Sequence, residues 1–256
     1  MATAHSDGVD LHFEAAGEGE TLAFVGDVGF GAWQWAWQHE ALTGPFETIV
    51  YDHRGTGRSD APGGPYDVAT LVEDLAAVLS AAGARNAHLV GLGLGGIVAL
   101  EYAREHARTE TLTLLGTASE TDAVDPMALY APGDDPGALR ETTERAFSDA
   151  FVDRHPAAVE DVAGWRADDD ADRAGWSAQA AAVRTYEGRD LYEVTTPTVV
   201  VHGTADGSWP IQAGRTLADA LPRGEFEPVE GAGHCVQIEA SEAIDDLLFG
   251  RAEAEF

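Results

Sequence analysis

The chain has 256 residues, a mass of 27.0 kDa and a single cysteine, which suits one compact domain and excludes an internal disulfide framework or a cysteine-based zinc site. Acidic residues number 45 against 15 basic ones, all of them arginine, so the formal net charge is −30. Such a charge repels phosphate backbones and anionic lipid surfaces, so we expect neither a nucleic-acid partner nor a membrane partner.

Short β-type runs alternate with helical patterns along most of the chain. In the first half we expect a strand at 9–13, a strand at 21–25, a helix at 33–42, a strand at 46–51, a helix at 66–79, a strand at 87–90, a helix at 97–107 and a strand at 111–116. In the last quarter we expect a strand at 196–203, a helix at 211–221, a strand at 224–230 and a helix at 239–249. Because parallel strands need crossover helices, this alternation predicts an α/β fold, with a mostly parallel central sheet and helices on both faces.

The stretch 119–194 interrupts this alternation. It is acidic, has a helical pattern, and lies between two expected strands of the sheet. An insertion at this point lies over the carboxyl ends of the strands, where open α/β sheets bind their ligands. We therefore predict a core formed by 1–118 and 195–256, and a helical lid formed by 119–194.

A glycine-rich turn, GLGLGG at 91–96, lies between an expected strand and an expected helix and matches two motifs. Gly91, Gly93 and Gly96 match the G-x-G-x-x-G of dinucleotide-binding proteins. The same turn matches the nucleophile elbow G-x-S-x-G, with Gly93 in the position of the serine. A dinucleotide-binding fold needs an acidic residue at the end of the next strand, but the first carboxylate there, Glu120, lies beyond it. A nucleotide-binding oxidoreductase is therefore the least supported class.

Two later segments favour the elbow. VVVHGTADGSWP places Asp206 just past a buried strand, and EGAGHCVQIE places His234 past the last strand. The elbow motif predicts the chain order nucleophile, acid and histidine. A histidine that is oriented by a carboxylate can act as a general base near neutral pH. We therefore predict that Asp206 and His234 lie within hydrogen-bond reach and that His234 faces Gly93.

Together with YDHRGTGRSD at 51–60, these segments make the chain similar to the α/β-hydrolase family, nearest to its lid-bearing esterase, enol-lactonase and epoxide-hydrolase-like members. The resemblance covers nearly the whole chain. It implies the α/β-hydrolase fold, a small-molecule substrate, and catalytic roles for His234 and Asp206. The serine of the family aligns with Gly93, so the usual nucleophile is absent. A Gly93→Ser substitution is accordingly expected to rebuild a serine nucleophile.

Backbone amides are expected to form an oxyanion hole beside Gly93. Leu94 begins the helix after the elbow, so its N–H should point into the pocket with the helix dipole behind it. The second donor would come from Asp27 or Val28, where the resemblance places the oxyanion loop. The Asp27 side chain could cap a turn, or could line the pocket as a base or a ligand contact, and we favour the turn.

The remaining conspicuous residues are given packing, anchoring or turn roles. These residues are Trp33, Trp35, Trp37, Arg54, Ser59 and Cys235.

More than one class of function stays open. A hydrolase acting on a small organic substrate would use the His234–Asp206 pair to activate water or to deprotonate the substrate, without a serine nucleophile. A cofactor-independent lyase or oxygenase, which the resemblance also implies, would use the same pair. A catalytically idle ligand-binding protein would have no physical need for both residues. The retained pair therefore favours an enzyme, with hydrolysis named first.

The acidic residues are dispersed through the periodic segments rather than collected in one tail. Concentrated salt screens such a charge, and this composition resembles that of cytosolic proteins from salt-accumulating halophiles. The N-terminal MATAHSDGVD lacks the basic and apolar regions of a signal peptide, and no apolar run approaches the roughly 20 residues of a membrane span. We therefore expect a cytoplasmic monomer or homodimer with no cofactor and no metal ion.

Overall fold

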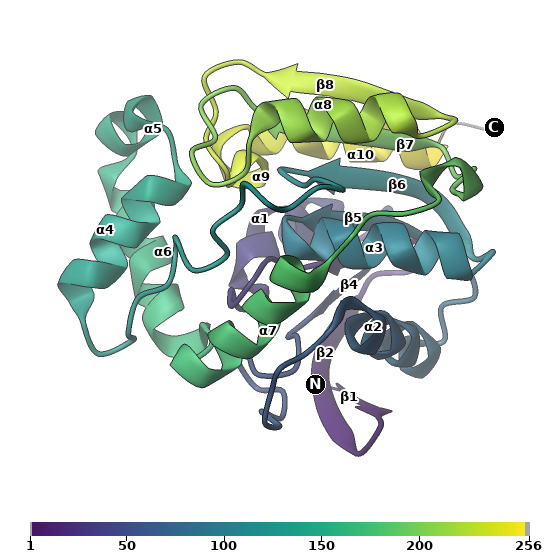
Figure 1. The fold of residues 1–256 in the computed structure, drawn as a ribbon, viewed down its shortest axis with the longest axis horizontal. Helices are drawn as coiled ribbons and strands as arrows, with labels where there is room; N and C mark the ends of the chain where they lie inside the picture. Colours follow the sequence, from purple (N-terminus) through teal and green to yellow (C-terminus); the bar gives the residue numbers. More distant parts are fainter. Residues whose placement is uncertain (1, 254–256) are drawn as a thin grey trace.

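The computed structural model describes residues 2–253, whose strands form one eight-stranded sheet in the order β1-β2-β4-β3-β5-β6-β7-β8 (Figure 1). The strands are β1 (Ala2–Ser6), β2 (Val9–Ala16), β3 (Thr21–Val25), β4 (Glu47–Tyr51), β5 (Ala87–Leu92), β6 (Thr109–Leu115), β7 (Thr198–Gly203) and β8 (Gly224–Val229). Strand β2 pairs antiparallel with β1 and β4, and the other pairs are parallel. The predicted mostly parallel sheet is therefore confirmed.

Helices cover both faces of the sheet. They are η1 (Ala32–Trp35), α1 (Ala36–Leu42), α2 (Val68–Ala82), α3 (Leu94–Glu105), α8 (Ile211–Ala220), α9 (Val236–Glu239) and α10 (Ser241–Glu253). Helices α2, α3 and α8 pack on one face, and α1 and α10 pack on the other. Each face has its own apolar core, with Leu75 and Ile97 in the first, and Trp35 and Leu248 in the second.

Several helix boundaries differ from the sequence prediction by a few residues, as at both ends of α2, and two differences concern α3 and the last predicted helix. Helix α3 begins at Leu94 rather than at residue 97, because the elbow turns β5 directly into the helix with Gly93 as its N-cap. The helix expected at 239–249 is divided into α9 and α10, which meet at Ala240. The early start of α3 matters for function, because it directs the N–H of Leu94 toward the carboxyl end of the sheet.

Four helices lie within the stretch 119–194, which we call the cap. They are α4 (Pro136–Ala146), α5 (Asp149–Arg154), α6 (Pro156–Asp169) and α7 (Arg173–Thr185), and the short η2 (Leu191–Glu193) follows them. In Figure 1 these four helices lie on the side toward which the arrowheads of β6 and β8 point. The cap therefore lies at the carboxyl ends of the parallel strands, while its exact boundaries stay a prediction.

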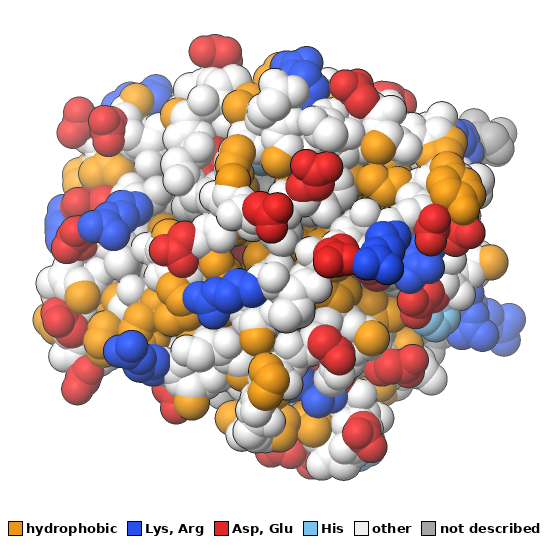
Figure 2. Space-filling model, viewed as in Figure 1, with side chains coloured by type: hydrophobic (Ala, Val, Ile, Leu, Met, Phe, Trp, Pro, Cys, Tyr) orange, Lys and Arg blue, Asp and Glu red, His pale blue; other side chains and the backbone are white. Residues whose placement is uncertain are grey.

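Acidic side chains are spread over the face of the molecule that Figure 2 shows, with arginine side chains among them. Several pairs are ionic, such as Arg140 with Glu144 and Arg104 with Glu101. No helix within residues 2–253 is long and apolar enough to cross a membrane. The negative charge thus forms no single large patch on this face.

Candidate active site

The turn between β5 and α3 has the backbone geometry of an elbow. Gly93 has a φ of 52° and a ψ of −114°, which lies in the left-handed half of conformational space that glycine adopts without penalty. A Cβ on Gly95 would lie 2.1 Å from the backbone oxygen of Val25, so the helix can approach β3 only because this residue is glycine. The hydroxyl of Thr117 donates to the Gly93 carbonyl at 2.7 Å. Close packing therefore explains the glycine pattern without a bound nucleotide.

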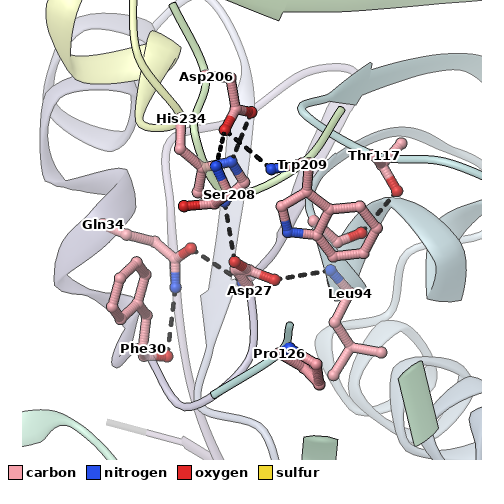
Figure 3. A network of polar contacts seen from close by, with 12 residues as sticks. Asp27, Phe30, Gln34, Leu94, Thr117, Pro126, Asp206, Ser208, Trp209 and His234 are labelled. Atoms are coloured by element: carbon pink, nitrogen blue, oxygen red, sulfur yellow. Dashed lines mark hydrogen bonds and ion pairs between the residues drawn. The ribbon is translucent and has the colours of Figure 1, made fainter. Parts of the chain in front are cut away.

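Asp206 and His234 lie together at the carboxyl end of the sheet, on the loops after β7 and β8 (Figure 3). The Nδ1 atom of His234 is 2.9 Å from Oδ2 of Asp206. The other oxygen of Asp206 accepts from the backbone N–H groups of Ser208 at 2.8 Å and Trp209 at 3.0 Å. The Nε2 atom of His202 is 3.2 Å from Asp206 Oδ2. The Asp206 carboxylate is thus fixed by two backbone N–H groups and by His234, while His202 lies beside it and is bonded to the carbonyl of Trp209.

A second carboxylate, that of Asp27, contacts the opposite side of the His234 ring (Figure 3). Asp27 Oδ2 is 3.0 Å from His234 Nε2, and Asp27 Oδ1 accepts from the N–H of Leu94 at 2.8 Å. The prediction that Asp27 caps a turn is therefore wrong. The side chain instead reaches across the elbow, because Gly93 has no side chain to stop it.

The Asp27 carboxylate occupies the space that a side chain at position 93 would need. A Cβ built on Gly93 would lie 2.0 Å from Oδ1 of Asp27 and 2.4 Å from its Cγ. Real Cβ atoms do not approach other atoms so closely. The glycine on the elbow and the aspartate on the loop after β3 therefore complement each other in volume.

The three predicted oxyanion donors differ in their partners. The Leu94 N–H points at the site as expected, but Asp27 Oδ1 already accepts from it. The backbone N–H of Asp27 donates to Oε1 of Gln34 at 3.0 Å, so the prediction of Asp27 as a backbone donor is wrong. Val28 is buried next to it and stays the predicted second donor.

Two carboxylates keep His234 protonated. Burial alone would lower the pKa of His234, but the charges and hydrogen bonds of Asp206 and Asp27 raise it to about 10. Burial likewise would raise the pKa of Asp206, but the charge of His234 and the hydrogen bonds from His202, His234 and Trp209 bring it well below its usual value. In the resting state His234 is therefore an imidazolium that can donate a proton, and the predicted general base must first lose one.

The free energy of unfolding is expected to fall as the pH rises from about 6.5 to about 10. The pKa of His234 is about 10 in the folded chain against an ordinary value of 6.5, so the folded state holds this proton more tightly than the unfolded state does. The stabilisation is complete below the lower value and is lost as the pH passes the higher one. Burial raises the pKa of the Cys235 thiol, so this group adds to the fall near the upper end of the window.

Urea unfolding at roughly pH 6, 8 and 10 measures this loss directly. A His234→Gln variant should show a much flatter profile, because it cannot bind the proton. Equal stability of the parent at the two ends of the window would contradict the doubly paired imidazolium.

The three tryptophans of η1 and α1 pack as predicted. Trp35 is wholly buried in the core between the sheet and α10. The Nε1 atom of Trp33 donates to Oδ1 of Asp170 in the cap at 2.8 Å. Trp37 meets Trp165 of α6 edge to face, with ring centroids 5.5 Å apart. None of the three tryptophans contacts His234 in these interactions, which are those of core and cap.

The other predicted structural residues also have such roles. Cys235 is buried, and burial raises the pKa of its thiol. The hydroxyl of Ser59 donates to the carbonyl of Asp52 at 2.6 Å. Arg54 forms two hydrogen bonds of 2.6 Å with the carboxylate of Asp74 on α2. These three side chains are therefore fixed by packing or by partners away from His234.

The site is closed in this structure. Asp27 and His234 are both buried, and a cavity of about 700 Å³ lies between α4, α5 and the loop after β7. Gly207 and Ser208 line this cavity, whereas Asp27 and His234 do not. Within residues 2–253, no group of three or more histidine, cysteine or acidic side chains is arranged to hold a metal ion.

This sheet, this elbow and this acid–histidine pair define an α/β hydrolase. The chain belongs to the alpha/beta hydrolase family, whose family model matches residues 24–247. It is 27% identical to a protein of Azorhizobium caulinodans that is named as the carbamate hydrolase RutD, over 98% of this chain and 97% of that protein.

Solved structures give the same assignment. The enol-lactonase from Burkholderia xenovorans has a TM-score of 0.87 and 26% identity, over 99% of this chain and 100% of that one. A hydrolase from Pseudomonas aeruginosa has a TM-score of 0.85 and 29% identity, over 99% of this chain and 98% of that one. The predicted fold and the predicted hydrolase class are therefore confirmed.

Proposed function

We propose that this chain is a hydrolase of small organic molecules in which the carboxylate of Asp27 replaces the serine that the elbow lacks. His234 and Asp206 form the acid–base pair of this centre, and the N–H of Leu94 stabilises negative charge. One observation carries the proposal: the Asp27 carboxylate fills the space above Gly93 and contacts both Leu94 and His234. A carboxylate held in this way can act as a nucleophile.

In the first step, Asp27 Oδ2 attacks an electrophilic carbon of the substrate. An electron pair of Oδ2 forms a new C–O bond, and the bond between that carbon and its leaving oxygen breaks. The leaving oxygen takes the proton from His234 Nε2, since this imidazolium is the charged donor beside Asp27. The step leaves an ester on Asp27 and a neutral His234.

In the second step, water cleaves the ester. An esterified Asp27 carries no negative charge, so one of the two carboxylates that raise the pKa of His234 no longer acts on it. His234 Nε2 can then take one proton from water, whose oxygen attacks Cγ of Asp27. Negative charge develops on Oδ1, which faces the N–H of Leu94. The bond between Cγ and Oδ2 breaks, and the substrate leaves as an alcohol that keeps Oδ2 and the second water proton.

A carboxylate nucleophile favours substrates with an electrophilic saturated carbon, above all an epoxide. Attack on an ordinary acyl ester would form an anhydride, which is more reactive than the ester consumed. Opening an epoxide releases ring strain and forms a stable ester, and the leaving oxygen stays attached where His234 can protonate it. We therefore propose an epoxide as the substrate, hydrolysed to a diol, rather than the carbamate or enol-lactone in the names of the relatives.

A second candidate, a catalytically idle ligand-binding protein, is favoured by the closed state of the site. Asp27 already accepts from the N–H of Leu94, and the cavity beside the loop after β7 is not lined by His234. In such a protein the Asp27 carboxylate would be a permanent occupant of the oxyanion position, and no ester would form on it.

A single turnover in oxygen-18 water tests the proposal. With the protein in excess over styrene oxide in molar KCl, the first turnover should place oxygen-18 in the Asp27 peptide and unlabelled oxygen in the diol. Mass spectrometry of both products measures this. Direct attack of water on the substrate would instead place the label in the diol. A His234→Gln variant should form the ester more slowly, because it lacks the proton donor of the first step. It should nevertheless retain the ester that forms, as a mass increase on Asp27, because it also lacks the base for the second step.

Absence of both turnover and a mass increase, across epoxides with small and bulky substituents, would favour the ligand-binding protein. The same protein should then bind without consuming its ligand.

A further inference from the structure

The loop that carries Asp27, residues 26–31 and here called the Asp27 loop, is held by the cap. The N–H of Gly29 donates to Oε1 of Gln179 on α7 at 2.7 Å. The carbonyl of Gly29 accepts from the N–H of Ala171 at 2.7 Å. Both backbone groups of Gly29, two residues after Asp27, are therefore bonded to cap residues.

The open face of Gly29 is also covered by the cap. A Cβ built on Gly29, whose φ is +71°, would lie 2.0 Å from a ring carbon of Trp176. The ring of Trp176 meets that of Phe30 edge to face, with centroids 5.6 Å apart, and its Nε1 donates to the carbonyl of Pro126. The Asp27 loop thus lies directly against α7 with no room for a side chain between them.

A buried ion pair holds the end of the loop. Asp170 Oδ1 accepts from Trp33 Nε1 at 2.8 Å and from the N–H of Gly31 at 3.3 Å. Its Oδ2 accepts from Nε of Arg166 at 2.8 Å. The guanidinium of Arg166 also lies 4.9 Å from the ring centroid of Phe30. Asp170 is therefore a second cap residue, besides Gln179, that is held in place by the ion pair and hydrogen-bonds the end of the Asp27 loop.

Gln179 connects the loop to the core from the cap side, whereas Gln34 and His53 hold the loop from within the core. It is wholly buried, and its Nε2 donates to the carbonyl of Arg54 at 2.9 Å and to the hydroxyl of Thr56 at 2.6 Å. Its amide can have only one orientation, because a donor faces Oε1 and acceptors face Nε2. One side chain of α7 thus bridges Gly29 of the Asp27 loop and the loop after β4.

We propose that Gln179 is a positioning residue, which holds the Asp27 carboxylate between Leu94 and His234 through Gly29, so that the site is complete only while the cap lies closed on the core. The inference rests on the proposed function, in which Asp27 reacts with the substrate. A nucleophile on the elbow would be fixed by β5 and α3 themselves. Asp27 lies on a loop instead, and a misplacement of about 1 Å can cost about a hundredfold in rate.

The test compares Gln179→Met with Gln38→Met. Gln38 is equally buried, but its Nε2 donates to the carbonyl of Gln237 and to Asp245, on the side of α1 away from the cap. We expect Gln179→Met to lower kcat for the epoxide by about 10- to 100-fold. We expect Gln38→Met to stay within about threefold of the parent.

Proton NMR supplies a readout that does not need turnover. The Nε2 proton of His234 lies in a hydrogen bond to Asp27, so it should give a resolved downfield signal in the parent and in Gln38→Met. In Gln179→Met this signal should shift or vanish, and the pKa of His234 should fall. A folded Gln179→Met protein that keeps both the signal and the kcat of the parent would overturn the proposal.

Should Gln179→Met fail to fold, Trp33→Phe provides the second variant. It removes the donor to Asp170 and keeps an aromatic ring, and Trp37→Phe is its matched control on the same segment. A kcat and an NMR signal that are equal in these two variants would overturn the part of the proposal in which the site is complete only while the cap lies closed on the core. If the parent forms no ester at all, the proposed function fails, yet the His234 signal still decides whether Gln179 positions Asp27.

Discussion

Replacing Asp27 with asparagine is expected to lower the single-turnover rate at least about a thousandfold. Asparagine has nearly the same shape, and its carbonyl oxygen can still accept from the N–H of Leu94. Its amide is not a nucleophile, however, so no ester can form. The substitution therefore removes the chemistry of Asp27 while it preserves the volume that Asp27 fills above Gly93.

The same substitution should change the protonation of His234. Asp27 contributes a charge and a hydrogen bond to the raised pKa of this imidazole, so the pKa should fall in Asp27→Asn. Asp206 remains beside Nδ1, so the pKa should stay above that of a histidine with no carboxylate partner. An NMR titration of the His234 ring in the parent and the variant measures the difference.

Asp52→Asn is a suitable control for this experiment. Asp52 is a buried aspartate that accepts from the N–H groups of Ala32 and Arg58, and neither of these bonds involves His234. We expect its rate and its His234 titration to match those of the parent. If the Asp27→Asn protein hydrolysed the substrate at the rate of the parent, Asp27 would not be the nucleophile, and water would attack the substrate directly.

Much of the core was predictable because its strands are buried on both faces. The runs that become β5 and β7 are mostly apolar and are buried along their whole length, and turn residues mark their ends. Strand β1 was not predicted, since only Ala4 and Ser6 of ATAHS are buried and neither gives a strong apolar signal. Its pairing with β2 decides its conformation, and that pairing is a tertiary contact.

The two halves of the site differ in how far the sequence reveals them. Asp206 and His234 follow strands in recognisable segments, so their meeting could be expected from the sheet order. The role of Asp27 depends on contacts with Leu94 and His234, which are 67 and 207 residues away along the chain. Two features of the sequence could have indicated this role: Gly93 stands in the nucleophile position, and Asp27 is an acidic residue on the loop expected to face it. The protonation of His234 could not be inferred, because it needs both carboxylates in place.

The second large effect concerns the elbow itself. Serine at position 93 was expected from the sequence to rebuild a nucleophile, but the structure changes the expected result for the single variant. The new Cβ would overlap Oδ1 of Asp27, at 2.0 Å. Asp27 would still accept the hydrogen bond from the N–H of Leu94 and would still keep His234 protonated. Gly93→Ser alone should therefore be strained and should not react with a fluorophosphonate probe.

The double variant Gly93→Ser/Asp27→Gly should behave differently. Removing the Asp27 side chain frees the space above the elbow, releases the N–H of Leu94, and lowers the pKa of His234 toward the range of a general base. We expect it to label with the fluorophosphonate at least about a hundredfold faster than either single variant, since one free oxyanion donor is worth about that much. It should also show an acyl-enzyme burst with an activated ester.

The strain at residue 93 is smaller than the free energy of unfolding of a typical domain. A side chain at a φ of 52° costs roughly 1–3 kcal/mol, against roughly 5–15 kcal/mol for the stability of a typical domain. Circular dichroism and thermal unfolding should therefore show a folded double variant, with Asp27→Gly alone as the unstrained control. Labelling of Gly93→Ser alone would mean that Asp27 leaves the elbow readily, which contradicts its fixed position. A folded double variant that stays inert would mean that removing Asp27 does not free His234 and Leu94 for a serine, and the carboxylate could then not be regarded as its replacement.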